Sequence, residues 1–217
     1  MKKLRVALVY NAYTDAQPDD KSDTGGLRDL RQMIRAIARG LRRLRHEVVV
    51  LPLAGDLSVL QRKLSRLRPD VVFNQYDDVV HGALYEMRVA AFIRMLGYPM
   101  TGSPALALGL SRYKHMSLSL LKGAGLPIPP STALIERLSD IDEHKWSFPL
   151  IVHAAHEHAG IGLARDSVVG TKTALREKAR EVLRVYKQPA LVQHFLKGRE
   201  FNVGLVGGRR VQVLPLA

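Results

Sequence analysis

Two groups of polar side chains in this 217-residue sequence have the types and spacing that could support chemistry. Asp77 and Asp78 are adjacent carboxylates that could bind an amine or a cation, although such pairs are more often solvated turn residues. His153, His156 and His158 form a His-x-x-His-x-His pattern, and imidazole is a good zinc ligand. These histidines fall where a predicted strand enters a loop of small residues, which disfavours a rigid site. We therefore expect no bound metal there.

The charge of the chain favours an anionic partner. Lysine and arginine together number 33 against 20 aspartates and glutamates, which gives a net charge of +13. A small anionic substrate such as a nucleotide needs only a few of these charges. Many of the others lie on the polar faces of two predicted helices, as an ordinary solvated surface does. Nucleic acid is therefore the less favoured partner, and a steep salt dependence of binding would be its signature.

The sequence has the features of a cytoplasmic protein. It contains no cysteine, which excludes disulfides and cysteine chemistry. The apolar run near the N-terminus is too short for a signal peptide and is interrupted by Asn11. No apolar run is long enough to span a bilayer, so we expect no membrane partner.

The first half of the chain alternates predicted strands and helices, which favours a doubly wound parallel sheet of the α/β class. Residues 4–10 form the continuous apolar run of a strand buried on both faces. Two further strands are expected at residues 48–53 and 71–74, and amphipathic helices at residues 27–46, 57–67 and 83–96. The polar segment after the first strand and the segment after the third lie at the carboxyl edge, where open α/β sheets bind ligands.

Residues 99–130 predict a junction between two domains, at residues 1–103 and 104–217. Two short helices are expected in the junction, the second at about residues 111–124 with Lys114 near its start and Met116, Leu120 and Leu121 at helical spacing. The second domain is expected to be α+β. Its strands are predicted at residues 131–135, 148–155 and 190–195, its helix at 171–187, and a hairpin at 200–216 around Gly207 and Gly208.

Several motifs follow one another in a fixed order. They are Thr-Gly-Ser at residues 101–103, Ser-Arg-Tyr-Lys-His at 111–115, Gly-Ala-Gly-Leu-Pro-Ile-Pro-Pro at 123–130, Phe-Pro-Leu-Ile-Val-His at 148–153, His-Glu-His-Ala-Gly-Ile-Gly at 156–162, Ala-Leu-Val-Gln-His-Phe-Leu at 190–196 and Gly-Arg-Glu-Phe-Asn-Val at 198–203. This series resembles the D-alanine–D-alanine ligases of the ATP-grasp superfamily. Residues 74–86 also resemble the third strand of these ligases and the helix beyond it. Each motif alone is weak, but the ordered series spans nearly the whole chain.

The resemblance implies ATP as the cofactor and a set of phosphate contacts. Lys114 matches a lysine that contacts phosphate, and the phosphate charge explains why a cation is needed there. His153 stands where a second phosphate lysine is expected. Glu157, Gly160 and Gly162 fall in the segment that resembles a flexible phosphate loop.

The resemblance also implies contacts to the nucleoside. Gln193, His194, Phe195 and Leu196 would line the adenine pocket, and Glu200 would accept hydrogen bonds from the ribose hydroxyls. Without the resemblance, Phe195 is more safely assigned to the hydrophobic core than to stacking against adenine.

The implied activity joins a carboxylate to an amine through an acylphosphate, as in peptidoglycan biosynthesis, with Mg²⁺ bridging the phosphates. Glu86 matches an acidic family position and is a weaker candidate for contact with the amino-acid-like substrate. Four substitutions put D-alanine itself in question: His153 replaces a lysine, Gln193 an acidic residue, His194 a residue that is often lysine, and Ala159 a serine. The loop after the first strand also lacks a Gly-Gly-x-Ser-x-Glu pattern.

The Mg²⁺ ligands of the resembling family lie downstream of Ala217. We therefore expect an incomplete ATP-grasp fold that does not complete catalysis by itself. A non-catalytic relative that binds nucleotide or a protein partner is the alternative, and nucleic-acid binding through the arginines of the first helix is a third reading. The resemblance further implies a homodimer through the N-terminal domain.

Overall fold

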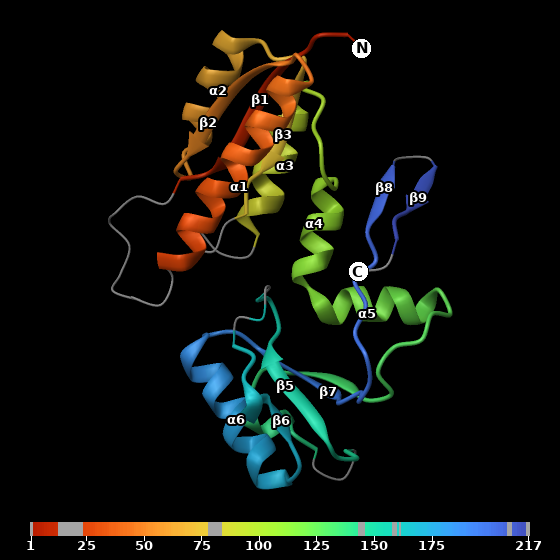
Figure 1. The fold of residues 1–217 in the computed structure, drawn as a ribbon. Helices are drawn as coiled ribbons and strands as arrows, with labels where there is room; N and C mark the ends of the chain where they lie inside the picture. The colour runs from red at the N-terminus through yellow and green to blue at the C-terminus, as the bar shows by residue number, and fades with distance from the viewer. Residues whose placement is uncertain are drawn as a thin grey trace. The chain divides into compact units, whose positions relative to one another are not determined.

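The computed structural model describes residues 2–12, 24–77, 84–142, 146–157, 160, 162–207 and 210–215, with the side chains of residues 24–29 left out. The chain divides by its contacts into two compact units (Figure 1). The first unit is Met1–Leu120 with His156–Ala159, and the second is Leu121–Ala155 with Gly160–Ala217. The predicted domain boundary after residue 103 stays a prediction, because a unit defined by contacts need not coincide with a domain.

A three-stranded parallel sheet forms the centre of the first unit. Its strands are β1 (Arg5–Asn11), β2 (Glu47–Leu53) and β3 (Val71–Gln75), in the order β2-β1-β3. A parallel bridge from Val72 to Met100 extends the β3 edge. The long apolar run of β1 fits this central place, since both of its faces are covered. The predicted parallel sheet is therefore confirmed.

Helices cover both faces of this sheet. Helix α1 (Thr24–Arg43) packs Ile34 and Ala38 on one face, against Val6, Leu8 and Val48. Helices α2 (Leu57–Leu67) and α3 (Tyr85–Met95) pack on the other face. The carboxyl ends of β1 and β3 therefore lie at the same edge of the sheet, which is where a doubly wound fold binds ligands.

Two helices follow in the region of the predicted junction. Helix α4 (Ala105–Arg112) ends one residue before α5 (Lys114–Gly123), and Tyr113 separates them with φ −90° and ψ 71°. The predicted second helix at 111–124 therefore begins later, at Lys114. The apolar spacing on α5 was a poor guide to burial: Met116, Leu120 and Leu121 are all exposed, and α5 buries none of its residues.

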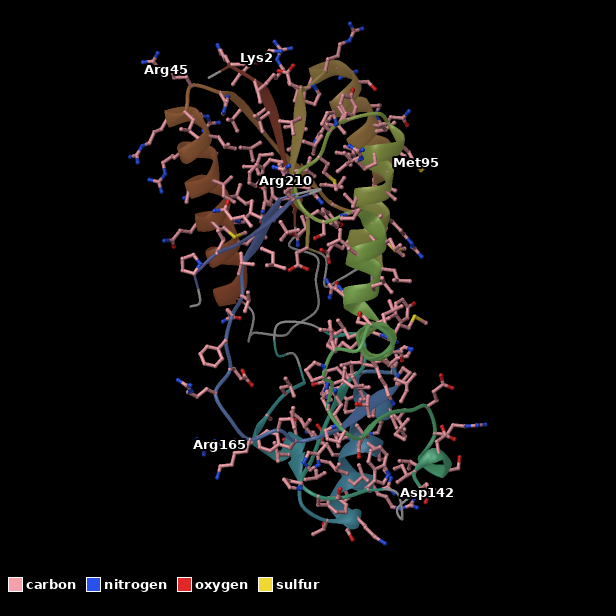
Figure 2. The ribbon with its side chains drawn as sticks, turned by 90° about the vertical axis from the view of Figure 1, so that its right-hand side faces the viewer. Lys2, Arg45, Met95, Asp142, Arg165 and Arg210 are labelled. Atoms are coloured by element: carbon pink, nitrogen blue, oxygen red, sulfur yellow. The ribbon has the colours of Figure 1, made fainter. Side chains whose placement is uncertain are left out.

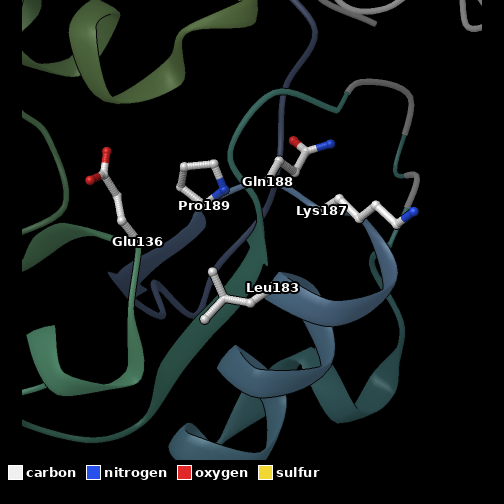
Figure 3. A pocket seen from close by; sticks show the side chains of 5 residues that line it. All are labelled: Glu136, Leu183, Lys187, Gln188 and Pro189. Atoms are coloured by element: carbon white, nitrogen blue, oxygen red, sulfur yellow. The ribbon is translucent and has the colours of Figure 1, made fainter.

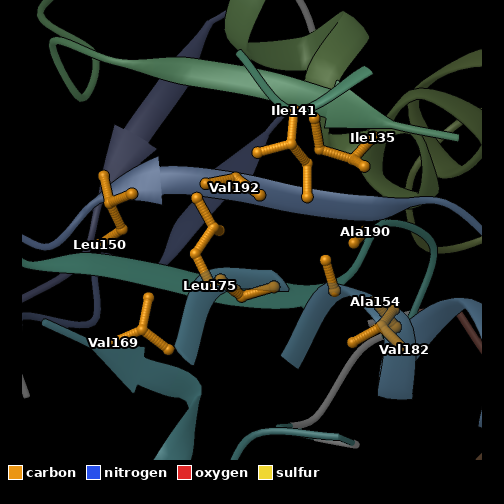
Figure 4. Packing of buried hydrophobic residues seen from close by; sticks show 11 residues of the cluster. Ile135, Ile141, Leu150, Ala154, Val169, Leu175, Val182, Ala190 and Val192 are labelled. Atoms are coloured by element: carbon orange, nitrogen blue, oxygen red, sulfur yellow. The ribbon is translucent and has the colours of Figure 1, made fainter. Parts of the chain in front are cut away.

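A four-stranded antiparallel sheet forms the second unit, in the order β4-β7-β5-β6. These strands are β4 (Thr132–Ile135), β5 (Leu150–Ala154), β6 (Val168–Val169) and β7 (Ala190–His194). Short 3₁₀ turns occur at Leu138–Asp140 and Arg165–Ser167. Helix α6 (Lys172–Val185) covers one face, and Figure 4 shows Leu175 and Val182 packed with Val192 and Ala154 in this core.

The predicted hairpin forms but is shorter than expected. Its strands are β8 (Leu205–Gly207) and β9 (Val211–Val213), paired antiparallel with Leu205 opposite Val213. Residues 200–204, which were predicted to be strand, are not, although the N–H of Leu214 still donates to the carbonyl of Gly204. Alternation alone therefore overestimated the length of the first strand. None of the helices in the described ranges combines the length and apolarity that a bilayer crossing needs.

Truncation of one core side chain tests the assigned face of α6. Leu175→Ala removes a side chain that has no solvent exposure, so the free energy of unfolding should fall by about 2–5 kcal/mol. Val185 lies on the same helix and is 53% exposed, so Val185→Ala should change the free energy of unfolding by only about 0.5 kcal/mol. Urea unfolding measures both variants, and equal losses would contradict the assignment.

Candidate functional site

The amino end of α5 carries the predicted phosphate lysine. Lys114 is the first residue of the helix and is half-buried, and its Nζ donates a hydrogen bond to the main-chain oxygen of Glu157. Burial lowers the pKa of Lys114, and the nearby Glu157 charge opposes that shift. Two residues that the sequence assigned to phosphate binding therefore meet within the first unit, although 43 positions separate them.

Three aromatic rings next to Lys114 or Glu157 in the chain pack against one another. The ring of His156 lies edge-on to Tyr113, with centroids 4.8 Å apart and planes at 70°. The His115 ring is 6.1 Å from Tyr113 and 6.4 Å from His156. Nδ1 of His156 also lies 3.4 Å from the main-chain oxygen of Arg112. Sequence reasoning missed Tyr113 and His115 as site residues, although both flank Lys114 directly.

Burial is the main influence on the charge of His156. It lowers the pKa of the imidazole, and the neighbouring His115 and Lys114 add to this effect. The Arg112 carbonyl and the Glu157 charge act in the opposite direction without reversing the shift. The imidazole is therefore held mainly neutral above its ordinary pKa of about 6.5.

A buried ion pair holds the carboxyl end of α4. The side chain of Arg112 is 5% exposed, and its Nη2 lies 2.9 Å from Oε2 of Glu86 and 3.0 Å from Oδ1 of Asp77. Burial raises the pKa of Glu86, and the Arg112 guanidinium opposes this only in part. The predicted substrate residue Glu86 is thus engaged by an arginine, and a substrate ammonium would compete with it. Asp78 lies outside the described residues.

The second unit holds the predicted nucleoside contacts at β5 and β7. His153 on β5 is 8% exposed, and its Nε2 is 3.1 Å from Oε1 of Gln193 on β7. Nδ1 of His153 is 3.2 Å from the main-chain oxygen of Ala154. A neutral imidazole satisfies both contacts only if the Gln193 amide presents its NH₂ group to Nε2. That orientation leaves the amide oxygen of Gln193 able to accept from a ligand.

The residues after β7 become progressively more exposed. His194 and Phe195 are half-buried, Leu196 is 61% exposed, and Glu200 is exposed. The N–H of Phe195 donates to the Pro149 carbonyl, so this stretch stays attached to the sheet beyond the last ladder residue. Phe195 is not among the buried core residues, against the safer sequence assignment.

Two glycines shape the predicted phosphate loop. Gly160 and Gly162 have φ of +76° and +75°, a region that favours glycine. A Cβ on Gly162 would also lie 3.0 Å from the Tyr186 ring. Ala159 and His158 lie outside the described residues.

Two further features involve residues that the sequence did not assign to the site. Asn11, at the carboxyl end of β1, is 4% exposed, and its amide has no hydrogen-bond partner within the described ranges. A surface pocket of about 370 Å³ in the second unit is lined by Glu136, Leu183, Lys187, Gln188 and Pro189, none of which was predicted to bind ligand (Figure 3). The described side chains include no group of three or more acidic or histidine residues that could hold a metal ion.

No family model matches the chain. Curated relatives nevertheless cover most of it. The uncharacterized protein y4sG of Sinorhizobium fredii is 28% identical over 98% of this chain and 64% of its own length. The D-alanine–D-alanine ligase of Aquifex aeolicus is 29% identical over 84% of this chain and 59% of its own, and that of a Marinomonas species is 31% identical over 78% and 52%.

Solved structures agree on the fold. A D-alanine–D-alanine ligase from Bacillus anthracis complexed with ATP has a TM-score of 0.69 at 15% identity, over 98% of this chain and 68% of that one. The ligase from Coxiella burnetii has a TM-score of 0.71 at 14% identity, over 99% and 70%. A RimK domain ATP-grasp protein from Sphaerobacter thermophilus has a TM-score of 0.60 at 17% identity, over 95% and 70%.

The solved structures define the class of protein. Over nearly its full length, the chain has the fold that ATP-grasp proteins share. Within that class it is a homologue of the D-alanine–D-alanine ligases, as the motif series predicted. The chain spans between half and two thirds of the length of these curated relatives.

Removal of the buried arginine should destabilise the first unit. Arg112→Ala leaves the Glu86 carboxylate buried without its partner, so the free energy of unfolding should fall by about 3 kcal/mol or more. Arg137 pairs with Asp140 but is 80% exposed, so Arg137→Ala should cost at most about 1 kcal/mol. Urea unfolding measures the free energy of unfolding of both variants. A loss in Arg112→Ala as small as that in Arg137→Ala would show that the buried ion pair does not stabilise the unit.

Stability of the first unit should also depend on pH through His156. The unfolded chain binds a proton at this histidine more readily than the folded chain does, so stability is lost as pH falls through and below about 6.5. His156→Phe should flatten this part of the pH dependence. Thermal unfolding of the wild type and of His156→Phe between about pH 7.5 and about pH 5.5 measures this dependence. The same change of Tm with pH in both proteins would refute the contribution of His156.

Proposed function

We propose that the chain is the nucleotide-binding part of an ATP-dependent carboxylate–amine ligase of the D-alanine–D-alanine ligase type. The observation that carries this proposal is the similarity to these ligases over 84% of the chain, together with the half-buried Lys114 at the amino end of α5. One of the structural neighbours is itself complexed with ATP. ATP would supply the phosphoryl group that activates a carboxylate toward an amine.

We infer that the phosphate contacts come from Lys114 at the start of α5 and from the segment that resembles a phosphate loop. The Lys114 ammonium would neutralise phosphate charge, because a cation in a partly desolvated place acts more strongly than one in water. Gly160 and Gly162 would let the main chain approach phosphate closely, and Glu157 would lie in the same loop. His153 would act mainly through Gln193, since its imidazole contacts that amide.

The nucleoside contacts of the proposal follow β7. The Gln193 amide oxygen would accept from the adenine amino group, in the orientation in which the Gln193 NH₂ group faces Nε2 of His153. The half-buried Phe195 would stack on the base, with Leu196 and His194 beside it. The exposed Glu200 carboxylate would accept from ribose hydroxyls. Three further points are also proposals. They are the carboxylate and amine substrates, the ability of the chain to complete catalysis, and a homodimer formed through the first unit.

A non-catalytic relative that binds nucleotide is the second candidate, and one contact favours it. Gln193, the predicted acceptor for adenine, already contacts the His153 ring, so adenine recognition depends on a specific amide orientation. Binding of nucleic acid has a weaker basis. Arg31, Arg35 and Arg39 are exposed on α1, and Figure 2 shows nitrogen-tipped side chains projecting from that helix.

Calorimetric titration with ATP tests the proposal directly. We expect saturable one-to-one binding that survives moderate salt and weakens by about tenfold or more in Lys114→Ala, because a charge-assisted phosphate contact is lost. Lys122, an exposed lysine in the last turn of α5, is the matched control, and Lys122→Ala should bind as the wild type does.

The same titration separates the alternatives. Added Mg²⁺ should change the affinity little, since the described side chains include no group of three or more acidic or histidine residues. Absence of ATP binding would refute the nucleotide-binding proposal, and equal weakening in Lys122→Ala would exclude a specific role for Lys114. Binding that short nucleic acids compete away, and that salt abolishes steeply, would instead favour the arginine face of α1.

A further inference from the structure

The segment that begins at Gly162 is attached to helix α6 by side chains to which the sequence assigned no role. We call residues 162–167 the anchor segment, and both it and α6 belong to the second unit. Its last three residues form the 3₁₀ turn Arg165–Ser167. Gly162 is one of the two glycines expected to let the main chain approach phosphate. The attachments of the anchor segment therefore also limit where this glycine can lie.

Ser167 is the buried side chain of the anchor segment. It has no solvent exposure, whereas the four residues before it are exposed. Its Oγ accepts a hydrogen bond from the N–H of Ala164 at 3.0 Å and donates one to the carbonyl of Gly162 at 3.3 Å. A hydroxyl can do both because it has one proton and two lone pairs. One buried side chain thus ties two main-chain groups of the segment to the residue that leads into β6.

Lys178 on α6 provides the second attachment. Its side chain is 7% exposed, and its Nζ lies 3.1 Å from both carboxylate oxygens of Asp166 and 3.0 Å from Oε2 of Glu181. An ammonium buried to this extent is costly unless carboxylates balance its charge. Asp166 directly precedes Ser167, so the carboxylate that balances this charge also holds the 3₁₀ turn against α6.

The ring of Tyr186, at the end of α6, lies against the other end of the segment. A Cβ on Gly162 would be 3.0 Å from this ring, so the main chain of Gly162 and the ring are close neighbours. Side chains of α6 therefore contact the anchor segment near both of its ends, and the Ser167 hydroxyl links those ends to each other.

These attachments leave one main-chain donor unused. Within the described ranges, the N–H of Gly162 makes no hydrogen bond, although its carbonyl does. The next N–H, that of Leu163, donates to the carbonyl of Gly160 at 2.9 Å. A donor that is already fixed in place does not have to be ordered when an anion binds, so it contributes more of its interaction to affinity.

We propose that Ser167 and Lys178 are positioning residues that preorganise the main chain of Gly162 for the phosphates of a nucleotide. This inference rests on the proposed function, because the phosphates are those of ATP. Neither side chain is expected to contact the nucleotide. Loss of either one should therefore weaken a ligand that carries phosphates and leave the binding of a nucleoside without phosphates unchanged.

Titration of the full chain with ATP and with adenosine, followed by NMR, tests the role of Ser167. Ser167→Ala should weaken ATP binding about three- to tenfold, the size expected for one lost hydrogen bond, and should leave adenosine binding unchanged. Ser139, an exposed serine of the same unit, is the matched control, and Ser139→Ala should bind both ligands as the wild type does. Equal weakening of ATP and adenosine, or unchanged ATP binding in a folded Ser167→Ala, would overturn the proposal.

A second pair of variants tests Lys178 in the same way. Lys178→Met should weaken ATP binding about two- to fivefold, a smaller loss because the Asp166 carboxylate is 67% exposed. Lys172 is an exposed lysine near the start of α6, and Lys172→Met removes the same charge without touching the anchor segment. The same loss of ATP affinity in both variants would show a general effect of charge and would overturn the role of Lys178.

Hydrogen exchange at the main-chain N–H of Leu163 separates failure of this inference from failure of the proposed function. This N–H contacts neither Ser167 nor Lys178, so its exchange reports the order of the segment. Exchange should become faster in Ser167→Ala and in Lys178→Met, and stay unchanged at Val192 in the centre of the sheet. That result without ATP binding in any protein would support the anchoring and refute the proposed function. Unchanged exchange at Leu163 in both variants would overturn the inference, whether or not ATP binds.

Discussion

The ion pair between Arg112 and Glu86 fixes the end of α4, and the candidate phosphate residues depend on that end. The guanidinium is almost fully buried, so its place is set by carboxylates that balance its charge. The next residue, Tyr113, interrupts the helix, and Lys114 begins α5. One buried charge therefore positions a ring and an ammonium that follow it directly in the chain.

This arrangement links stability to binding in the first unit. The same short segment supplies a structural arginine, a ring that holds His156, and a lysine suited to phosphate. The groups with lowered pKa, Lys114 and His156, are those that an anion would stabilise in their charged forms. Burial thus disfavours the charged form of Lys114 in the free unit, and a phosphate ligand would offset that cost.

Periodic patterns predicted most of the fold, and contacts between distant residues set the limit of that prediction. The apolar run of β1 and the stepped leucines of α2 show their buried faces in the sequence itself, because strand and helix periods differ. The apolar side of α5 was equally visible, yet it is exposed, since periodicity shows which face is apolar and not what covers it. Lys114 was found by its motif. Its contact with Glu157 and the Tyr113–His156 packing were not, because 43 residues separate each pair and no spacing rule connects them.

The central claim is that this chain binds ATP and that the Lys114 ammonium at the start of α5 contacts its phosphates. Side-chain NMR of the wild-type chain, titrated with ATP, tests it through the Lys114 ammonium. The account predicts that the Lys114 signal shifts and saturates, with the signal of the exposed Lys122 unchanged. Equal shifts at Lys114 and Lys122, or no shift at Lys114, would contradict it.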